Sequence, residues 1–202
     1  MALHLKRLVL ATRNLKKRRE LEALLLPLAI EIQTLDHYPA APAIVEDGAS
    51  FAENASKKAT QTAKALGEWT LGEDSGLAVD SLGGAPGIFS ARYAGMDATD
   101  QANNELLLQN MKGVPPSRRT AHYVCYAAIA DPQGGIVREA EGHCFGRIRE
   151  EPSGQGGFGY DPLFEIPEYH RTFGEITAAV KQIVSHRARA LRELARWLSR
   201  QG

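Results

Sequence analysis

The sequence predicts an α/β domain with a mixed sheet. Segments with helical spacing of apolar residues alternate with short apolar strands, which favours parallel strand pairs. One long apolar hairpin stands in the middle of the chain and adds an antiparallel pair, so the sheet is expected to be mixed. The segments rich in proline or glycine are only loops in length. The 202 residues therefore suit a single domain spanning residues 1–202.

The first third of the chain predicts two strands and two helices. A strand over residues 7–12 precedes a helix from about Asn14 to Leu26, where Asn14 is a good N-cap and leucines recur at helical spacing. A short strand follows at residues 31–35. A second helix is expected over residues 50–66, with alanines along one face and Gly67 after its end.

The rest of the chain continues the alternation. Residues 69–80 read as an apolar segment interrupted by two acids, and a loop rich in glycine and proline follows to Gly95. A third helix is predicted over residues 99–111, then a hairpin over 120–148 that turns at 131–135. The last helix is expected to begin at Ser185, because apolar residues recur there along one stripe.

Composition excludes several classes of protein. Twenty-four Lys and Arg balance 24 Asp and Glu, so the chain does not bind nucleic acid polymers by bulk positive charge. The longest uncharged apolar stretch, Tyr123–Ala130, is far shorter than the roughly 20 residues that a membrane span needs. Cys125 and Cys144 make neither a disulfide framework nor a zinc motif, and Cys125 reads as a buried free thiol. We therefore expect a cytoplasmic protein that uses neither nucleic acid nor membrane as a partner.

Basic residues occur where helices begin. The first helix opens with Lys16, Lys17, Arg18 and Arg19, with Arg13 just before them, and the last opens with His186, Arg187 and Arg189. Because a helix N-terminus already carries partial positive charge, such residues are unfavourable unless an anion binds there. Either they point into solvent, or the two helix starts bind phosphate groups.

Acidic pairs complement these basic segments. Glu46 and Asp47 precede the second helix, and Glu73 and Asp74 lie at a turn after a predicted strand. Both pairs occur in sequences that are common in ordinary turns. Carboxylates beside a phosphate-binding surface are, however, typical ligands of Mg²⁺. Together the charges favour a nucleotide or polyphosphate substrate.

A glycine-rich segment near residue 158 indicates a pocket for a planar base. Residues 154–159 match G-x-G-x-x-G as a string, but no strand precedes them, so this is no dinucleotide fingerprint. The sequence also lacks the P-loop motif. Phe158 and Tyr160 stand beside Asp161 between glycines, and an aromatic face with a carboxylate suits a purine. The alternative is that these aromatics fill the edge of a core.

Several separated motifs resemble the inosine/xanthosine triphosphate pyrophosphatase family. The matching segments are residues 8–14 with Lys17, 51–55 with Lys58, 74–77, 83–93, 156–162, Lys181 and 185–187. The resemblance runs nearly end to end. It implies a long mixed central sheet, two lobes with the active site in the cleft between them, and a homodimer. It also implies Mg²⁺-dependent hydrolysis of a deaminated purine nucleoside triphosphate to the monophosphate and pyrophosphate.

The family motifs also imply roles for individual residues. Asp74 would be the catalytic base and a metal ligand, with Glu46 as a second metal ligand. The substrate-binding residues implied are Thr12, Arg13, Asn14, Leu15, Lys16, Lys17, Lys58, Ser75, Phe158, Gly159, Tyr160, Asp161, Lys181, His186 and Arg187. The residues of the first loop, together with Lys58 and Ser75, would bind the phosphates, and Phe158 would stack on the purine. The edge of the base or the sugar would be recognised by Asp161, Lys181, His186 and Arg187.

Three departures from the family pattern bear on these roles. Arg13 and Lys16 replace two glycines that the family usually has in the first loop, Glu73 stands where an Asp is usual, and Ala178–Val180 replace acidic residues. We still expect an active enzyme. The alternatives are a related hydrolase with another modified-base preference and a nucleotide sensor without catalysis.

Overall fold

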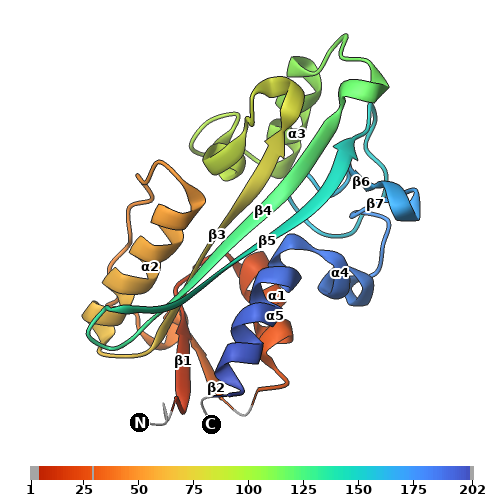
Figure 1. Cartoon of the computed structure of the whole chain (residues 1–202). Coiled ribbons are helices and arrows are strands. Elements are labelled where there is room, and N and C mark those ends of the chain that lie inside the picture. Colours follow the sequence, from red (N-terminus) through yellow and green to blue (C-terminus); the bar gives the residue numbers. More distant parts are fainter. Residues whose placement is uncertain (1–4, 29, 201–202) are drawn as a thin grey trace. The chain divides into compact units, whose positions relative to one another are not determined.

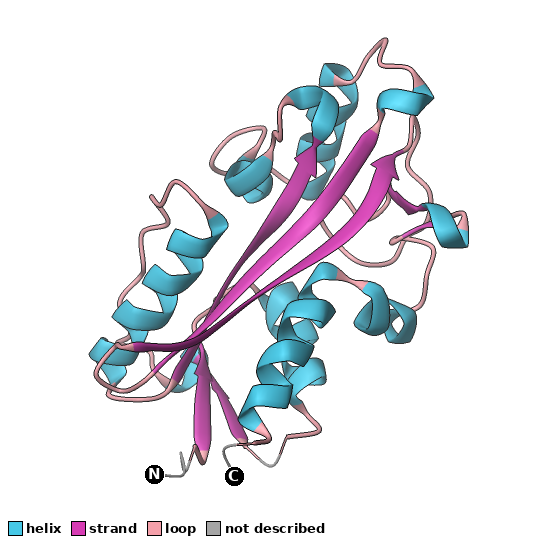
Figure 2. Ribbon diagram, viewed as in Figure 1, coloured by secondary structure: helices cyan, strands magenta, loops and turns pink. Residues whose placement is uncertain are grey.

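A computed structural model of the chain describes residues 5–28 and 30–200. It contains one seven-stranded sheet in the order β2-β1-β3-β4-β5-β6-β7, with helices packed against it (Figures 1 and 2). β1 pairs in parallel with β2 and β3, whereas β6 pairs antiparallel with β5 and β7. The predicted mixed α/β sheet is therefore confirmed.

The elements follow the predicted order closely. The strands are β1 (Arg7–Leu10), β2 (Glu31–Thr34), β3 (Thr70–Val79), β4 (Thr120–Ala130), β5 (Ile136–Ile148), β6 (Phe164–Ile166) and β7 (Arg171–Thr172). The helices are α1 (Leu15–Leu25), α2 (Phe51–Leu66), α3 (Asp100–Asn110), α4 (Ala178–Val184) and α5 (His186–Leu198). Three elements, β6, β7 and α4, were not predicted, because none of them shows a clear periodic pattern. The predicted turn at Glu73 and Asp74 is wrong, since β3 runs unbroken from Thr70 to Val79 through both residues.

The chain divides into two compact units. The first comprises Met1–Asp74, Cys125–Gly142 and Arg187–Gly202, and the second comprises Ser75–Val124 and His143–His186. Strands β3, β4 and β5 each contribute one part to each unit. The boundaries in β3 and at the start of α5 separate Asp74 from Ser75 and His186 from Arg187.

The first unit packs helices on both faces of its strands. Successive residues of a strand point to opposite faces. Leu8 and Leu10 of β1 accordingly join a core with α1 and α5, whereas Val9 packs with Leu35 and Ala41. The same alternation in β4 directs Cys125, Ala127 and Ile129 toward α1 and α5, and directs Ala128 and Ala130 toward Ala59 and Ala63 of α2. Cys125 and Cys144 are buried free thiols, as predicted for Cys125.

Gly72 lets α2 lie directly on β3. A Cβ atom at this position would be 2.2 Å from the carbonyl oxygen of Ala55 and 2.5 Å from the amide nitrogen of Ala59. Real Cβ atoms do not approach other atoms so closely, so any side chain here would push the helix away from the strand.

The second unit has a separate core that is rich in aromatic residues. Leu107 of α3 and Met111, which follows the helix, pack with Leu77 and Val79 of β3. Tyr123 stacks on Phe173 and meets Phe164 edge to face, with ring centroids 5.8 and 4.8 Å apart. Such arrangements stabilise a core beyond the apolar area that they bury.

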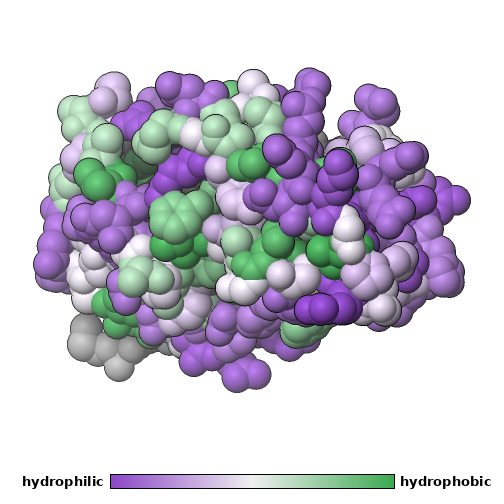
Figure 3. Space-filling model, turned by 90° about the horizontal axis from the view of Figure 1, so that it is seen from above, coloured by the Kyte–Doolittle hydropathy of each residue, from purple (hydrophilic) through white to green (hydrophobic). Residues whose placement is uncertain are grey.

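One face of the molecule carries small apolar groups. In Figure 3 hydrophobic side chains form small groups between polar ones on the face that is shown. Isolated exposed apolar side chains of this kind are normal on a folded protein. Within the described residues no helix is both long and apolar enough to cross a membrane.

The close contact at Gly72 predicts a large effect of a single methyl group. Gly72→Ala should lower the free energy of unfolding by about 3 kcal/mol, because α2 must shift to admit the new Cβ. Gly67→Ala is the matched control, since Gly67 has a φ of +67° but open space around it, and it should cost about 1 kcal/mol. Urea unfolding measures both values. A cost at Gly72 no larger than at Gly67 would contradict the close packing.

Candidate active site

A buried cluster of acids and lysines lies on β3 and α2 in the first unit. Asp74 is 5% exposed; its Oδ1 accepts a hydrogen bond from Lys58 Nζ at 3.1 Å and its Oδ2 accepts one from Asn54 Nδ2 at 3.2 Å. Asn54 and Lys58 are four residues apart on α2 and so share one face of the helix. The helix therefore holds both oxygens of the Asp74 carboxylate.

Glu46 joins this cluster from the loop that precedes α2. Its Oε2 lies 3.0 Å from Lys58 Nζ, so the carboxylates of Glu46 and Asp74 converge on one ammonium group. Asn54 Oδ1 also accepts a hydrogen bond from the Gly48 amide at 2.8 Å, which fastens the loop that carries Glu46. The sequence placed Glu46 and Asp74 together by resemblance, and they do lie close together.

Burial is the largest single influence on the pKa values of Asp74, Glu46 and Lys58, but neighbouring charges outweigh it at Glu46 and Lys58. Burial raises the pKa of Asp74, and Lys58 and Lys17 only partly offset this effect. Burial alone would also raise the pKa of Glu46, but Lys58 lowers it below its usual value. Burial would lower the pKa of Lys58, whereas Asp74, Glu46 and Glu73 together raise it. Asp74 is thus a stronger base than an exposed aspartate, beside a lysine that stays charged.

Glu73 points away from this pair into a second buried network. Its Oε1 accepts hydrogen bonds from Arg187 Nε and Nη2 at 3.2 and 3.0 Å, and its Oε2 lies 3.1 Å from Lys17 Nζ. Arg187 Nη1 also donates to Glu20 of α1. Cys125 donates its thiol to Glu73 Oε1 at 3.4 Å. Lys17 lies 3.9 Å from Asp74 as well, so it connects the two networks.

Arg187 is the most deeply buried charge in this network. It is 1% exposed, and burial would lower its pKa, but Glu73 and Glu20 raise it. Sequence analysis grouped Arg187 with residues that read the base. The structure gives its guanidinium to two carboxylates of the first unit instead. Recognition of the base by Arg187 stays a prediction, because the contacts described for its guanidinium are to Glu73 and Glu20.

The loop before α1 presents the predicted phosphate-binding residues at the surface. Asn14 caps α1, as predicted, because its Oδ1 accepts the amides of Lys16 and Lys17 at 3.0 and 3.1 Å. Thr12 Oγ1 accepts the Asn14 amide, and Arg13 donates to the Ala41 carbonyl at 3.0 Å. Residues 13–16 are exposed, and among them Leu15 is an apolar side chain in contact with solvent.

The second unit brings together three of the predicted base-binding residues. Asp161 Oδ2 accepts hydrogen bonds from the Phe158 amide at 2.7 Å and from Lys181 Nζ at 2.6 Å. The Lys181 ammonium lies 4.7 Å from the centre of the Phe158 ring, which is a cation–π geometry. A Cβ at Gly157 would collide with Asp161, so this tight loop requires a glycine there.

Tyr160 and His186 are buried in the aromatic core of this unit. The Tyr160 hydroxyl donates to the Ser90 carbonyl at 2.8 Å, and burial raises its pKa. His186 stacks on Tyr123 with ring centroids 4.6 Å apart and planes 8° from parallel. Ser75 is half-buried on β3. The substrate contacts that the resemblance implies for these three residues stay predictions.

Asn54, Glu20, Asp100 and Asn104 were not singled out from the sequence. Asn54 could have been found, because its spacing to Lys58 places both on one helix face. Glu20 and Asn104 gave no such signal, because their partners lie 167 and 55 residues away along the chain.

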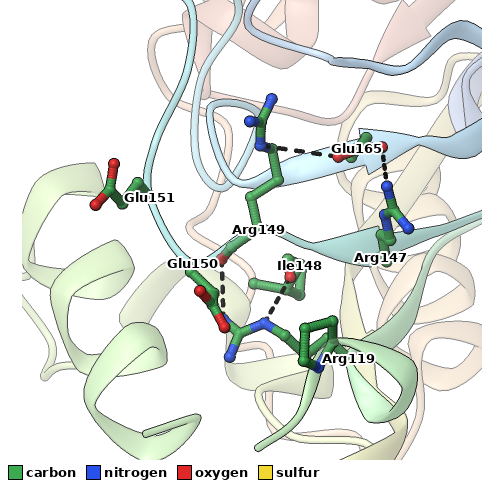
Figure 4. A pocket seen from close by; sticks show the side chains of 8 residues that line it. Arg119, Arg147, Ile148, Arg149, Glu150, Glu151 and Glu165 are labelled. Carbon is green, nitrogen blue, oxygen red and sulfur yellow. Dashed lines mark hydrogen bonds and ion pairs between the residues drawn. The ribbon is translucent and has the colours of Figure 1, made fainter.

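A separate pocket of the second unit contains none of the predicted residues. It measures about 370 Å³ and is lined by Pro116, Arg119, Arg147, Ile148, Arg149, Glu150, Glu151 and Glu165 (Figure 4). Arg119 donates to four backbone carbonyls, including those of Ile148 and Arg149. Arg147 and Arg149 both pair with Glu165. Each of the three arginines is thus bonded to the backbone or to Glu165 within this unit.

The donors available for a metal are carboxylate oxygens. Among residues 5–28 and 30–200, no group of three or more His, Cys, Asp or Glu side chains is placed to hold a metal ion. Mg²⁺ needs only one or two carboxylates when waters and substrate phosphates complete its shell. Glu46 and Asp74, which already converge on one cation, fit that requirement.

Comparisons with known proteins find relatives over nearly the whole chain. The chain is 52% identical over 185 residues to a dITP/XTP pyrophosphatase of Rhodopirellula baltica, covering 92% of this chain and 89% of the relative. It is 48% identical over 194 residues to a dITP/XTP pyrophosphatase of Desulforamulus reducens, covering 96% of each.

Solved structures are similar over the same length. A HAM1 protein from Coxiella burnetii superimposes with a TM-score of 0.88 at 37% identity, over 96% of this chain and 98% of the other. A nucleoside-triphosphatase, or dITP/XTP pyrophosphatase, from Mycobacterium abscessus gives a TM-score of 0.76 at 41% identity, over 93% and 98%. The sequence profile of the Ham1 family matches residues 8–197, and the chain therefore belongs to the Ham1 family.

Proposed function

We propose that this chain hydrolyses deaminated purine nucleoside triphosphates, namely ITP, dITP, XTP and dXTP, to the monophosphate and pyrophosphate. The enzyme would remove these nucleotides from the pool. The observation that carries the proposal is the buried Asp74 carboxylate, held by Asn54 and Lys58 beside Glu46. The names of the relatives support the same reaction.

Mg²⁺ would bind at Glu46 and Asp74. Their oxygens are the hard donors that this ion prefers, and substrate phosphates would complete its coordination. When bound, the ion would supply positive charge for the oxygens of the triphosphate.

Asp74 would act as the base in the chemical step. It would accept a proton from water as the water oxygen bonds to the α-phosphorus and the bond to the bridging oxygen of pyrophosphate breaks. Lys17 and Lys58 lie beside Asp74, where they would neutralise charge that develops on the phosphate oxygens. The first loop, from Thr12 to Lys17, and Ser75 would bind the remaining phosphates.

The loop at Phe158 would bind the purine in the second unit. Phe158 would stack on the base, while Gly159, Tyr160, Asp161, Lys181 and His186 would surround its edge or the sugar. Hypoxanthine and xanthine carry a 6-keto oxygen where adenine carries an amino group. Lys181 is a donor beside the Phe158 ring, so it would favour the keto form and leave an unpaired polar group against adenine. Its position favours Lys181 over Arg187 as the residue that reads this oxygen.

The resemblance supplies the rest of the proposal. Residues 1–202 would work as a single pyrophosphatase domain. The enzyme would be a cytoplasmic homodimer with no nucleic acid polymer or membrane as a partner.

Pyrophosphate release tests the proposed function directly. ITP, XTP, ATP and GTP are compared with Mg²⁺ at one concentration below saturation, and again after the metal is removed with EDTA. We expect rapid release from ITP and XTP, little from ATP and GTP, and none without metal. Equal release from all four would retain the chemistry and reject base selectivity. No release from any would favour the sensor alternative, and orthophosphate in place of pyrophosphate would favour a different hydrolase.

Asp74→Asn should separate catalysis from binding. The amide cannot take the proton from water, so kcat should fall at least about 100-fold, while nucleotide affinity stays within about tenfold. Asp47→Asn is the matched control, because Asp47 is an exposed acid beside Glu46 that pairs with Lys57. Steady-state kinetics and calorimetry measure the two quantities. Loss of nucleotide binding by a folded Asp74→Asn protein would refute the assigned role.

Arg187→Ala should destabilise the fold. It leaves Glu73 buried without its guanidinium partner, and removal of one partner of a buried ion pair costs about 3–5 kcal/mol. Arg196→Ala, on the exposed face of the same helix, should change the free energy of unfolding by less than about 0.5 kcal/mol. Denaturant unfolding compares the two. Equal stability of the two variants would show that the buried network does not depend on Arg187.

A further inference from the structure

Both backbone polar groups of Gly159, its amide and its carbonyl, are held by side chains of α3. Asp100 Oδ2 accepts a hydrogen bond from the Gly159 amide at 3.0 Å, and Asn104 Nδ2 donates to the Gly159 carbonyl at 2.9 Å. Asp100 and Asn104 are four residues apart on the helix and thus share one face. All of these residues lie in the second unit.

Gly159 lies at the centre of the loop proposed to bind the base. It follows Phe158, and its φ is +60°, a left-handed conformation that suits glycine. A segment with glycines at 154, 156, 157 and 159 has many accessible conformations when unfolded, so one fixed conformation requires several contacts. Asp161 supplies one contact at the Phe158 amide, and the Tyr160 hydroxyl supplies another at Ser90. The α3 contacts hold the peptide between these two.

The packing of α3 does not depend on these two side chains. The helix joins the core through Leu107 and Met111, whereas Asp100 is exposed and Asn104 half-buried. Asn103 has a different role, because it accepts the Ala94 amide at 2.8 Å. Loss of the bonds to Gly159 should therefore release the loop and leave the helix in place.

We propose that Asp100 and Asn104 are positioning residues for base recognition. By fixing the Gly159 peptide they hold the Phe158 ring in the arrangement that would accept a purine. This inference rests on the proposed function. A loop that is ordered before binding costs less to order on binding, so the effect falls on affinity and base selectivity rather than on the chemical step.

Kinetics of matched variants test the proposal. Asn104→Ala removes the donor to the Gly159 carbonyl, and Asp100→Ala removes the acceptor of its amide. Asp100→Asn retains an acceptor oxygen without the charge and should rescue the loss. The control is Glu105→Ala, an exposed residue of the same helix that pairs with Gln101. We expect each of the two disruptive alanine variants to raise KM for ITP roughly fivefold to tenfold, the factor expected for one lost hydrogen bond, and to lower the ITP-to-ATP ratio of kcat/KM. The kcat of both alanine variants should stay within about twofold of the wild-type value. The KM and the ITP-to-ATP ratio of Asp100→Asn and of the control should also stay within about twofold of the wild-type values.

Amide hydrogen exchange at Gly159 gives a readout that does not require activity. The Gly159 amide should exchange at least about fivefold faster in Asp100→Ala than in the wild type or Asp100→Asn. If the wild type releases pyrophosphate from ITP but Asn104→Ala and Asp100→Ala keep its KM and selectivity, the inference is overturned. A fall in melting temperature without a change in KM would overturn it equally, since the residues would then be structural only. If the wild type itself releases no pyrophosphate, the proposed function fails, and with it the role in base recognition, whatever the exchange rates show.

Discussion

The ion pair between Lys58 and Asp74 depends on a close contact at Gly72, two residues before Asp74 on β3. Two charges removed from water are costly unless each finds partners, and here both lie almost completely buried. The contact that permits the pairing is backbone to backbone: Gly72 touches Ala55 and Ala59, the residues directly after Asn54 and Lys58. A strand without a side chain at this point allows the helix to approach until both of its polar residues reach the carboxylate. Asn54 then fastens Gly48, so the position of the loop carrying Glu46 follows from the same contact.

A second buried network is built on the neighbouring residue of the same strand. Because side chains alternate along a strand, Glu73 and Asp74 point to opposite faces. Asp74 meets α2, and Glu73 meets Arg187 of α5 and Lys17 of α1. Glu73 therefore contributes by holding cations in place. The change from the usual aspartate gives the carboxylate one more methylene, and both of its oxygens are used, one by Arg187 and the other by Lys17. Lys17 lies near Asp74 as well as near Glu73, so its ammonium group links the carboxylates on the two faces of β3.

Much of this arrangement could be predicted from the sequence, and the rest depended on contacts between distant segments. The N-cap at Asn14, the alanine face of α2 and the turn at Asp131 are local signals, and each is confirmed. The grouping of His186 with Arg187 in one base-binding site stays a prediction, and the structure gives the two side chains different contacts. Adjacent residues of a helix point about 100° apart, so His186 enters the aromatic stack with Tyr123 while Arg187 enters the carboxylate network. No pattern along the chain predicts Glu20 as a partner 167 residues from Arg187.

The different partners of Arg187 and Lys181 bear on how a base would be selected. A guanidinium is a rigid fork, and in Arg187 its Nε, Nη1 and Nη2 atoms all donate to carboxylates, so turning it toward a ligand would strand buried negative charge. An ammonium instead presents three donors around one atom and can keep one partner while it serves another. Lys181 is bonded to Asp161 and lies over the Phe158 ring, so it joins the charged and aromatic parts of the loop. Asp161 in turn holds the Phe158 amide. A change in the loop backbone would thus move the aromatic surface and the cation together, and selectivity for the 6-keto group would depend on the geometry of the whole loop.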